Sequence, residues 1–542
     1  MSYANFLRLH AVQRDRLVIW VSPMSELDDL LQRVFRLEQF RPYQREIIAD
    51  VVSGSDVVCV MPTGAGKSLC FQLPALLLKG LTVVVSPLIS LMADQVRQLQ
   101  GLGVPVLLLN SSQESHEQSQ VLNRLRNGFD GLLYLAPERF AAASFQRVLP
   151  QLQTRLLVVD EAHCLSFWGH DFRPEYMRLA EVREQLGSPV TIALTATATP
   201  EVRNDIVRML KLRSPKLHVT GFDRPNLVYA CRRIDFEYAK DEALAHGLSK
   251  QPGSGIVYCA TRKKVEYLTA YLHEKFPERT VRAYHAGMDS DARKNAQQDF
   301  MASADAVVVA TNAFGMGINK PEIRFVVHYN IPASLEAYYQ EAGRAGRDGR
   351  TAQCVLYCSL VDRHTQEFFI DKIGENNTAL APAQVELLQA HARQKLERMF
   401  QYAYARRCRR RAILAYFGDN SEVGNCKCDV CRGDIRAQPS PAPLRTRKRK
   451  TSDKPQLPSA EDAPLDPLAI LRYERLKAVR LELARAHKMV AFWVAHDSVL
   501  REIARRAPQN LPALARIRGI GELKLEKFGA AFLAAVRGSG AD

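Results

Sequence analysis

Two adjacent carboxylates, Asp160 and Glu161, directly follow the apolar run 156–159. A short apolar run of this kind predicts a buried parallel strand, and open α/β sheets bind ligands beyond the carboxyl ends of such strands. There Asp160 could help to hold a divalent cation, and Glu161 could polarise an attacking water molecule. The alternative is an acidic strand end that binds nothing, and motifs elsewhere in the chain argue against it.

Aromatic and basic side chains follow the carboxylates within a few residues. They are Phe167, Trp168, His170, Phe172, Arg173 and Tyr176. Aromatic rings and arginine suit stacking on the unpaired bases of a nucleic acid. The alternative is a buried aromatic cluster that only packs. If the rings stack on bases, one stretch of chain contains both a site for a metal ion and a nucleotide and a contact for a nucleic acid, because the carboxylates are so close.

A glycine-rich loop lies upstream, where residues 61–68 read MPTGAGKS between an apolar run and a helical pattern. This is the context that a phosphate-binding loop requires. Gly64 and Gly66 would let backbone N–H groups approach phosphate oxygens at a helix N-terminus. Lys67 would neutralise the β- and γ-phosphates, and Ser68 would bind Mg²⁺. The loop therefore predicts bound ATP, with the candidate ligands Thr63, Gly64, Gly66, Lys67 and Ser68.

Two arginines three residues apart, Arg344 and Arg347, lie in the segment 340–349, which reads QEAGRAGRDG. Residues at this spacing share one face of a helix. Phosphoryl transfer needs positive charge near the γ-phosphate in the transition state. We therefore expect Arg347 to act as an arginine finger, with Arg344 beside it on a phosphate and Gln340 in the same catalytic group. If these side chains belong to a second lobe, ATP binds in a cleft and its hydrolysis changes the angle between the lobes.

The elements that must position these residues form two successive sets of apolar runs with helical patterns between them. The first set predicts strands at 57–60, 82–85, 131–134, 156–159 and 191–194, and the second predicts strands at 255–258, 306–309 and 325–328. Repeated strand–helix–strand units indicate parallel sheets. The expected fold class is α/β, with two tandem parallel-sheet lobes at 24–221 and 222–361.

Beyond the second lobe the composition changes three times. Residues 362–435 read as helical, basic and finally cysteine-rich, and residues 436–465 have the composition of a basic, Pro-rich linker. Residues 466–540 show the pattern of a small helical bundle. The linker's basic run 445–450 either contacts nucleic acid or is only a solvated tether. Residues 1–23 are read as an N-terminal extension, either disordered or due to a mis-assigned start, with a transit peptide as a weaker alternative.

The bulk composition restricts the partners and the compartment. The 542 residues carry a formal net charge of +16, which favours a polyanionic partner, most commonly nucleic acid. No apolar run approaches the roughly 20 residues that cross a bilayer, so no membrane partner is expected. Eleven cysteines, an odd number, and no secretory signal favour a reducing cytosol.

Four cysteines, Cys408, Cys426, Cys428 and Cys431, are candidate metal ligands near the end of the basic helical stretch. Four thiolates form a closed, tetrahedral, structural zinc site. Only Lys427 separates the second and third cysteines, which strains two ligands of one ion. The alternatives are three cysteines with a different fourth ligand, or a lost site.

In this order the motifs closely resemble those of RecQ helicases, over roughly residues 24–435. Residues 40–44 (FRPYQ) are similar to the family's adenine-reading motif, in which Arg41 and Gln44 would hold the base. Leu37 stands where the family often has an aromatic residue. Residues 166–174 (SFWGHDFRP) resemble the RecQ aromatic-rich loop. The resemblance assigns the coupling of DNA to ATP hydrolysis to Ser166, Phe167, Trp168, His170, Phe172 and Arg173.

The resemblance implies two RecA-like lobes, a helical zinc-binding module and Zn²⁺ on the four cysteines. The C-terminal bundle, residues 473–537, is similar to the helicase-and-RNase-D C-terminal (HRDC) domain. Many RecQ proteins have a winged-helix domain after the zinc module, and here only the linker 436–465 intervenes. The implied activity is an ATP- and Mg²⁺-dependent 3′–5′ DNA helicase of recombination and repair.

The implied partners are single-stranded and forked DNA, with a single-strand-binding protein or other repair proteins beside them. We expect a monomer in the bacterial cytoplasm, associated with the nucleoid. Three alternatives stay open: a DNA-stimulated translocase or remodeller that unwinds poorly, a non-catalytic nucleic-acid-binding scaffold, and an RNA helicase. Lys67, Glu161 and Arg347 argue against the scaffold, whereas the aromatic loop and the cysteines favour DNA over RNA.

Overall fold

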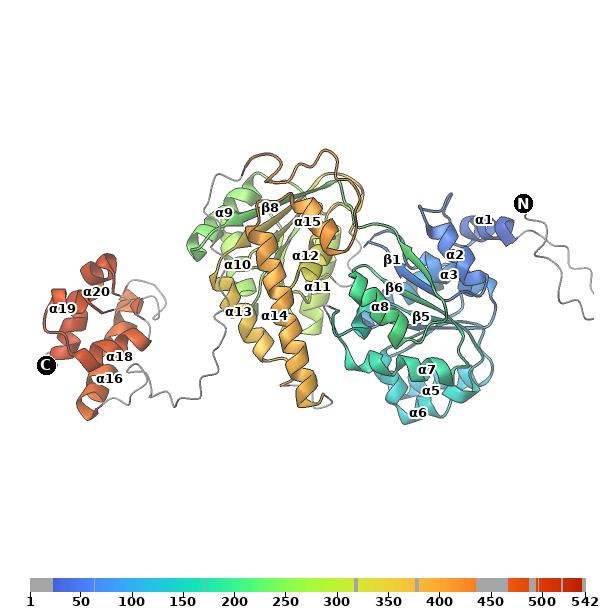
Figure 1. The fold of residues 1–542 in the computed structure, drawn as a ribbon, viewed down its shortest axis with the longest axis horizontal. Helices are drawn as coiled ribbons and strands as arrows, with labels where there is room; N and C mark the ends of the chain where they lie inside the picture. Colours follow the sequence, from blue (N-terminus) through green and yellow to red (C-terminus); the bar gives the residue numbers. More distant parts are fainter. Residues whose placement is uncertain are drawn as a thin grey trace, which may run out of the picture. The chain divides into compact units, whose positions relative to one another are not determined.

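The computed structural model describes residues 23–62, 64–169, 171–315, 320–375, 380–434, 466–486, 494–495, 497–517 and 520–538. The contacts within the chain divide it into two compact units, residues 1–442 and residues 443–542. The first unit contains both parallel sheets and the cysteine cluster, and the second unit is helical (Figure 1). No helix among the described residues is both long and apolar enough to cross a membrane.

The first lobe is built on a seven-stranded sheet in the order β3-β4-β2-β5-β6-β1-β7, in which all pairs are parallel. Parallel strands with short apolar sequences need cover on both faces. The strands are β1 (Val57–Val60), β2 (Leu81–Val85), β3 (Val106–Leu109), β4 (Gly131–Leu135), β5 (Thr154–Val159), β6 (Val190–Thr195) and β7 (Lys216–Val219). The candidate carboxylates follow β5, at the centre of the sheet.

Helices cover both faces of this sheet. One face packs against α2, α3 and α4, and the other packs against α5, α7 and α8. The helices of the lobe are α1 (Pro23–Arg33), α2 (Gln44–Val52), α3 (Leu69–Leu77), α4 (Ile89–Gly101), α5 (Ser115–Arg126), α6 (Ala143–Gln146), α7 (Leu179–Gln185) and α8 (Pro200–Met209).

The second lobe has a six-stranded parallel sheet in the order β10-β11-β9-β12-β13-β8. Its strands are β8 (Leu227–Arg233), β9 (Gly255–Tyr258), β10 (Val281–Tyr284), β11 (Val307–Ala310), β12 (Phe325–His328) and β13 (Ala352–Cys358). The expectation of two tandem parallel-sheet lobes is confirmed, and the strands predicted in each set are present.

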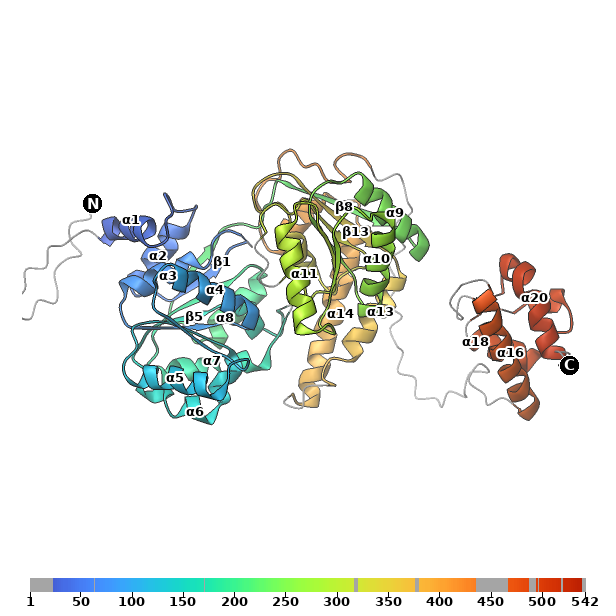
Figure 2. The ribbon, with the colours of Figure 1, turned by 180° about the vertical axis from the view of Figure 1, so that it is seen from behind.

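Helices α9 (Glu237–Ser249) and α10 (Arg262–Lys275) cover one face of the second sheet. The other face packs against α11 (Ser290–Ala302), α12 (Leu335–Ala342), α14 (Pro382–Tyr404) and α15 (Arg409–Tyr416). Helix α13 (Val361–Asp371) precedes α14 and contacts it. Figure 2 shows α10, α11 and α13 from behind. Because α14 and α15 share the core of the second sheet, the cysteine-bearing segment is attached to this lobe.

The second unit consists of α16 (Pro467–Ala486), α18 (Asp497–Arg506), α19 (Leu511–Ala515) and α20 (Glu522–Arg537). Its apolar side chains form a separate core that includes Leu476, Leu500, Leu514 and Phe532, all of them fully buried. A helical C-terminal bundle was predicted, and the described residues confirm it.

Candidate nucleotide and nucleic-acid site

The glycine-rich loop connects the end of β1 to the start of α3. Gly64 and Gly66 both have φ of +87°, a left-handed conformation that glycine adopts without steric cost. A Cβ atom on Gly66 would lie only 2.4 Å from Gln44 Nε2. Both glycines are therefore required by the loop's backbone. Thr63 lies outside the described residues.

Arg41 and Gln44, the candidate base-binding residues, contact the loop in this structure. Gln44 Nε2 donates to the Gly66 carbonyl at 2.9 Å, and the Arg41 guanidinium donates to the Gly64 carbonyl. The Gln44 side-chain oxygen accepts from the Arg41 backbone N–H at 2.8 Å. Gln44 is buried, whereas Arg41 is exposed. The segment before α2 is therefore tied directly to the phosphate loop.

Lys67 and Ser68 occupy the last positions of the loop. Lys67 Nζ donates to the Met61 carbonyl at 3.2 Å, so the ammonium folds back over the loop. The Ser68 hydroxyl accepts a hydrogen bond from Gln95 Nε2 of α4 at 3.4 Å. Both side chains are half-buried, a position from which they could turn towards a bound anion and its cation.

Asp160 and Glu161 lie just beyond β5 and differ in their surroundings. Asp160 is 8% exposed, its Oδ2 accepts from the Ser86 hydroxyl at 3.3 Å, and its Oδ1 accepts from the Glu161 N–H at 3.0 Å. Burial and the charge of Glu161 raise the pKa of Asp160 to about 7, although Lys67 opposes that shift. A divalent cation at this carboxylate would lower the pKa again.

Glu161 has φ of +48° and ψ of +46°, which is uncommon for a residue with a side chain. Its Oε2 lies 3.3 Å from His163 Nδ1, and the same nitrogen lies 2.9 Å from the Thr195 hydroxyl at the end of β6. Strained backbone of this kind clusters at functional sites. The carboxylate is thus linked to the segment 195–197 through a buried histidine.

The arginines are placed differently from the prediction. Helix α12 ends at Ala342, so Arg344 and Arg347 lie on the turn that follows it, not on one helical face. Gly346, with φ of +56°, sits between the two arginines in a conformation that an α-helix excludes. Gln340 is half-buried on α12.

Only one of the two arginines reaches the phosphate loop. The Cγ atom of Arg347 would lie 3.4 Å from a Cβ atom on Gly64, so this side chain contacts the loop from the second lobe. Arg344 is 4% exposed and donates to the Gly315 carbonyl inside its own lobe. The role of Arg344 on a phosphate stays a prediction. Burial, then Arg344 and Arg224, lower the pKa of Arg347 to about 10.

The aromatic loop that follows the carboxylates is held by contacts within the loop and with other parts of the first lobe. Phe167 and Phe172 stack with their ring centroids 4.3 Å apart. The Ser166 hydroxyl donates to Asp205 Oδ2 of α8 at 2.6 Å and accepts from the Trp168 N–H at 3.0 Å. Arg173 donates to the Pro87 carbonyl at 3.1 Å. His170 lies outside the described residues.

Helix α14 holds the tip of the aromatic loop. The Trp168 and His391 rings stack at a centroid distance of 3.5 Å, and Lys395 Nζ donates to the Gly169 carbonyl. Sequence reasoning missed both α14 residues. Their spacing of four places them on one helical face, but this signal says nothing about which loop they meet.

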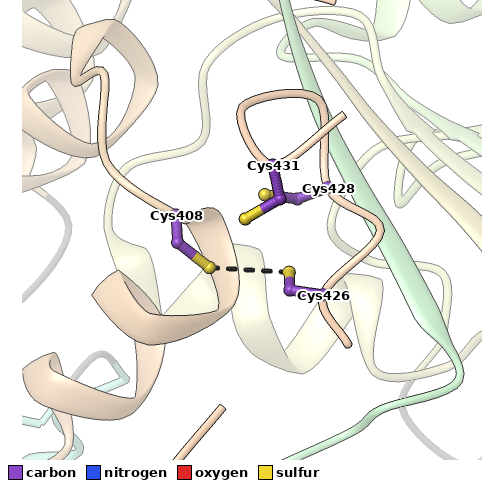
Figure 3. A group of neighbouring side chains, drawn as sticks. All are labelled: Cys408, Cys426, Cys428 and Cys431. Carbon is purple, nitrogen blue, oxygen red and sulfur yellow. Dashed lines mark hydrogen bonds between the residues drawn. The ribbon is translucent and has the colours of Figure 1, made fainter. Parts of the chain in front are cut away.

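The four predicted cysteines come together in the segment that follows α14 (Figure 3). Their sulfur atoms all lie within 4.8 Å of one another, and Cys408 Sγ is 3.5 Å from Cys426 Sγ. Tetrahedral zinc with Zn–S bonds of about 2.3 Å needs sulfurs roughly 3.8 Å apart, so the cluster fits this ion. The single residue between Cys426 and Cys428 does not keep either thiol out of the group.

Four protein families match successive parts of the chain. Residues 41–206 match the DEAD/DEAH box helicase family, and residues 239–349 match the helicase conserved C-terminal domain. Residues 360–432 match the RecQ zinc-binding family, which contains the cysteine cluster. Residues 471–536 match the HRDC domain.

The chain is also similar to whole proteins. It is 34% identical over 602 residues to the ATP-dependent DNA helicase RecQ of Bacillus subtilis, covering 94% of this chain and 98% of that protein. The chain belongs to the RecQ helicase family. This RecQ chain is 42% identical over 403 residues to the Haemophilus influenzae RecQ, which is 74% of this chain but 63% of that relative. It thus spans less than two thirds of that protein's length.

Solved structures share the fold of this RecQ chain. The DUF1998 helicase MrfA, bound to DNA and AMPPNP, superimposes with a TM-score of 0.52 at 19% identity, covering 64% of this chain and 52% of that one. Mss116p, bound to single-stranded RNA and AMP-PNP, gives a TM-score of 0.53 at 16% identity, covering 73% and 89%. At these identities the likeness concerns the fold alone.

Proposed function

We propose that the protein is an ATP-dependent DNA helicase that moves 3′ to 5′ along a single strand. The observation that carries the proposal is the approach of Arg347, from the second lobe, to Gly64 of the phosphate loop in the first lobe. A nucleotide on this loop would lie between the lobes. Its hydrolysis would remove the charge that Arg347 contacts, and the lobes would then move.

Each residue of the site has a proposed role. Lys67 neutralises the β- and γ-phosphates of ATP, and Ser68 and Asp160 hold Mg²⁺. Glu161 orients the attacking water, and Arg347 stabilises the transition-state charge. Arg41 and Gln44 read the adenine, a role that requires them to exchange their contacts with the loop carbonyls for contacts with the base.

DNA is the proposed nucleic-acid partner. The relatives are named as DNA helicases, and a net charge of +16 favours a polyanion. The stacked pair Phe167–Phe172 and the ring of Trp168 suit stacking on unpaired bases. We place single-stranded and forked DNA along this loop, in recombination and repair, on nucleoid DNA in the cytoplasm. A monomer working beside a single-strand-binding protein or other repair proteins completes the proposal.

The proposed domains are two lobes at 24–221 and 222–361, a zinc module at 362–435, a linker at 436–465 and an HRDC-like domain at 466–540. Residues 1–23 precede the first lobe. The zinc-binding and HRDC matches leave only residues 433–470 between them, which is too short for a typical independent domain of about 50 residues or more. This interval favours the second candidate function, a DNA-stimulated translocase that separates strands poorly.

The test is ATP hydrolysis with no nucleic acid, with single-stranded DNA and with single-stranded RNA. The proposal predicts turnover that DNA stimulates strongly and RNA stimulates weakly, and that Lys67→Ala abolishes. Lys79→Ala, which alters an exposed lysine just after the end of α3, is the control and should keep full turnover. Turnover that persists in Lys67→Ala, or that only RNA stimulates, would overturn the proposal.

A further inference from the structure

The short segment between β7 and β8 joins the two lobes and contacts three other parts of the first unit. It comprises residues 221–226, and each of Phe222, Asp223, Arg224 and Asn226 forms a contact with a residue far away in the sequence. A connection that only had to link two lobes would need none of these contacts. The segment is therefore a fixed junction between the two lobes.

Arg224 holds the turn that carries the arginine finger. Its Nη1 donates to the Gly343 carbonyl at 3.1 Å, and its Nη2 donates to the carbonyls of Ala345 and Gly346 at 2.9 Å and 3.1 Å. These three carbonyls flank Arg344 and directly precede Arg347. A planar guanidinium presents several donors in a fixed arrangement, so this one side chain holds three carbonyls within the four residues 343–346.

Asn226 strengthens the same attachment from the next position along the segment. Its Nδ2 donates to the Gly346 carbonyl at 2.8 Å and to the Arg350 carbonyl at 2.9 Å. A Cβ atom on Gly346 would lie 2.6 Å from this nitrogen, so the amide packs directly on the glycine. The turn on both sides of Arg347 is thus bound to the inter-lobe segment.

The other side of the segment is bound to the zinc module. Asp223 Oδ2 accepts from Arg410 Nη2 of α15 at 2.6 Å. The rings of Phe222 and Phe417 stack at 4.5 Å with an interplanar angle of 10°, and the Phe222 N–H donates to Asp419 Oδ2 at 2.9 Å. Adjacent residues of one short segment therefore connect the zinc module on one side with the finger-bearing turn on the other.

The first lobe also reaches this junction. Arg203 of α8 lies over the Phe222 ring, 6.0 Å from its centroid, and donates to the Phe417 carbonyl. If the three carbonyl contacts of Arg224 were lost, the turn that carries Arg347 would lose its attachment to the inter-lobe segment at these points. The position of Arg347 against Gly64 therefore depends on Arg224, which does not itself contact the described residues of the phosphate loop.

We propose that Arg224 is a positioning residue for ATP hydrolysis, which sets the place of Arg347 at the phosphate loop by holding its turn to the inter-lobe segment. The proposal rests on the proposed ATPase function. Misplacement of a catalytic group by about 1 Å can cost roughly 100-fold in rate. Because Lys67 and its loop belong to the first lobe, the binding of ATP should be less affected than its turnover.

The test compares Arg224→Gln with Arg279→Gln in the full chain. Arg279 is a matched control, since it is also half-buried in the second lobe and donates to the carbonyls of Leu248 and Gln251, away from the finger. We expect Arg224→Gln to lower the kcat of DNA-stimulated hydrolysis by about 10- to 100-fold with little change in the KM for ATP. Arg279→Gln should keep its kcat within about twofold.

A double variant separates positioning from loss of structure. If Arg224 acts through Arg347, the change Arg224→Gln should have little further effect on kcat in an Arg347→Ala background. Equal losses in both backgrounds, or a kcat unchanged by Arg224→Gln, would overturn the inference. Arg224→Lys keeps the charge but cannot reach three carbonyls, and full activity of this variant would also overturn it. A wild-type chain without ATPase activity would instead refute the proposed function.

Discussion

The contact between Trp168 of the aromatic loop and His391 of α14 contains a titratable ring. Burial, then the charge of Lys395, lower the pKa of His391, whereas Asp205 opposes the shift. Because the pKa of His391 is lower when the ring is stacked than when it is free, the ring takes up a proton more readily once the stack is broken. The stacked arrangement is therefore complete above the ordinary histidine pKa of about 6.5 and weakens as the pH falls through that value.

This contact gives a prediction at the scale of the residue. In a chain with Trp20 and Trp493 replaced by phenylalanine, the fluorescence of Trp168 should change as the pH falls below about 6.5. The same titration of a His391→Gln variant is the control and should be flat in that range. A flat titration of the parent chain, or an identical change in the variant, would show that His391 does not hold the indole.

The sequence motifs identify candidate site residues, but they do not indicate which of the basic side chains are buried. In the basic run 406–411, Arg409 and Arg410 are buried in ion pairs with Asp429 and Asp223, whereas Arg407 and Arg411 are exposed. Composition alone describes the whole run as a basic surface. Which arginines point inward depends on acidic partners that lie far away in the sequence, and no local pattern indicates them.

Edge strands account for most of what the apolar runs did not predict. The unpredicted strands are β3, β7, β8, β10 and β13, and the first four form the two edges of each sheet. Three of these edge strands carry polar or charged residues: β7 (KLHV) has no buried position, and β8 and β10 contain arginine. A search for continuous apolar runs finds strands that are buried on both faces and passes over these three. The edge strand β3 differs, because VLLL is itself an apolar run with three buried positions.

The aromatic loop gives a prediction at the scale of the element. Phe172→Ala removes the ring that stacks on Phe167, and Trp168→Ala removes the ring on His391. Both variants should still bind ATP, because among the described residues these rings have no contact with the phosphate loop. Each should lose most of the stimulation of ATP hydrolysis by DNA, since stacking on a base is worth about 1–3 kcal/mol.

The control for the loop is Phe236→Ala, which removes an aromatic ring that is 63% exposed at the start of α9. Its stimulation by DNA should equal that of the wild type. Full stimulation of Phe172→Ala and Trp168→Ala would mean that the loop only packs against α14, and a uniform loss in all three variants would indicate a general loss of structure.

The cysteine cluster gives a second prediction at this scale. The protein should contain one tightly bound zinc ion per chain, as measured by elemental analysis, and Cys426→Ser and Cys428→Ser should each lose it. Loss of the ion should lower the melting temperature, because Asp429, beside Cys428, accepts from Cys231 N–H of β8 at 2.8 Å and ties the cluster to the second sheet.

The control is Cys259→Ser. Cys259 is buried elsewhere in the second lobe, so this variant should keep its zinc. Retention of zinc by either cluster variant would show that the altered cysteine is not a ligand.

At the scale of the whole molecule, the contacts across the first unit form one continuous path. The hydrophobic core extends from the first sheet through the second sheet to α14 and α15. Along it, the aromatic loop contacts α14, the zinc module contacts the inter-lobe segment, and this segment holds the turn of Arg347. A DNA strand bound at the aromatic loop and ATP bound at the phosphate loop would thus act on the same set of contacts.

Strand separation coupled to ATP tests the central claim most directly. With ATP and Mg²⁺, the wild-type chain should separate a duplex with a 3′ single-stranded tail and should leave a duplex with a 5′ tail intact. Lys67→Ala should separate neither substrate, and Lys79→Ala should match the wild type. Strong DNA-stimulated ATP hydrolysis without separation of the 3′-tailed duplex would contradict the account and leave a translocase that does not unwind.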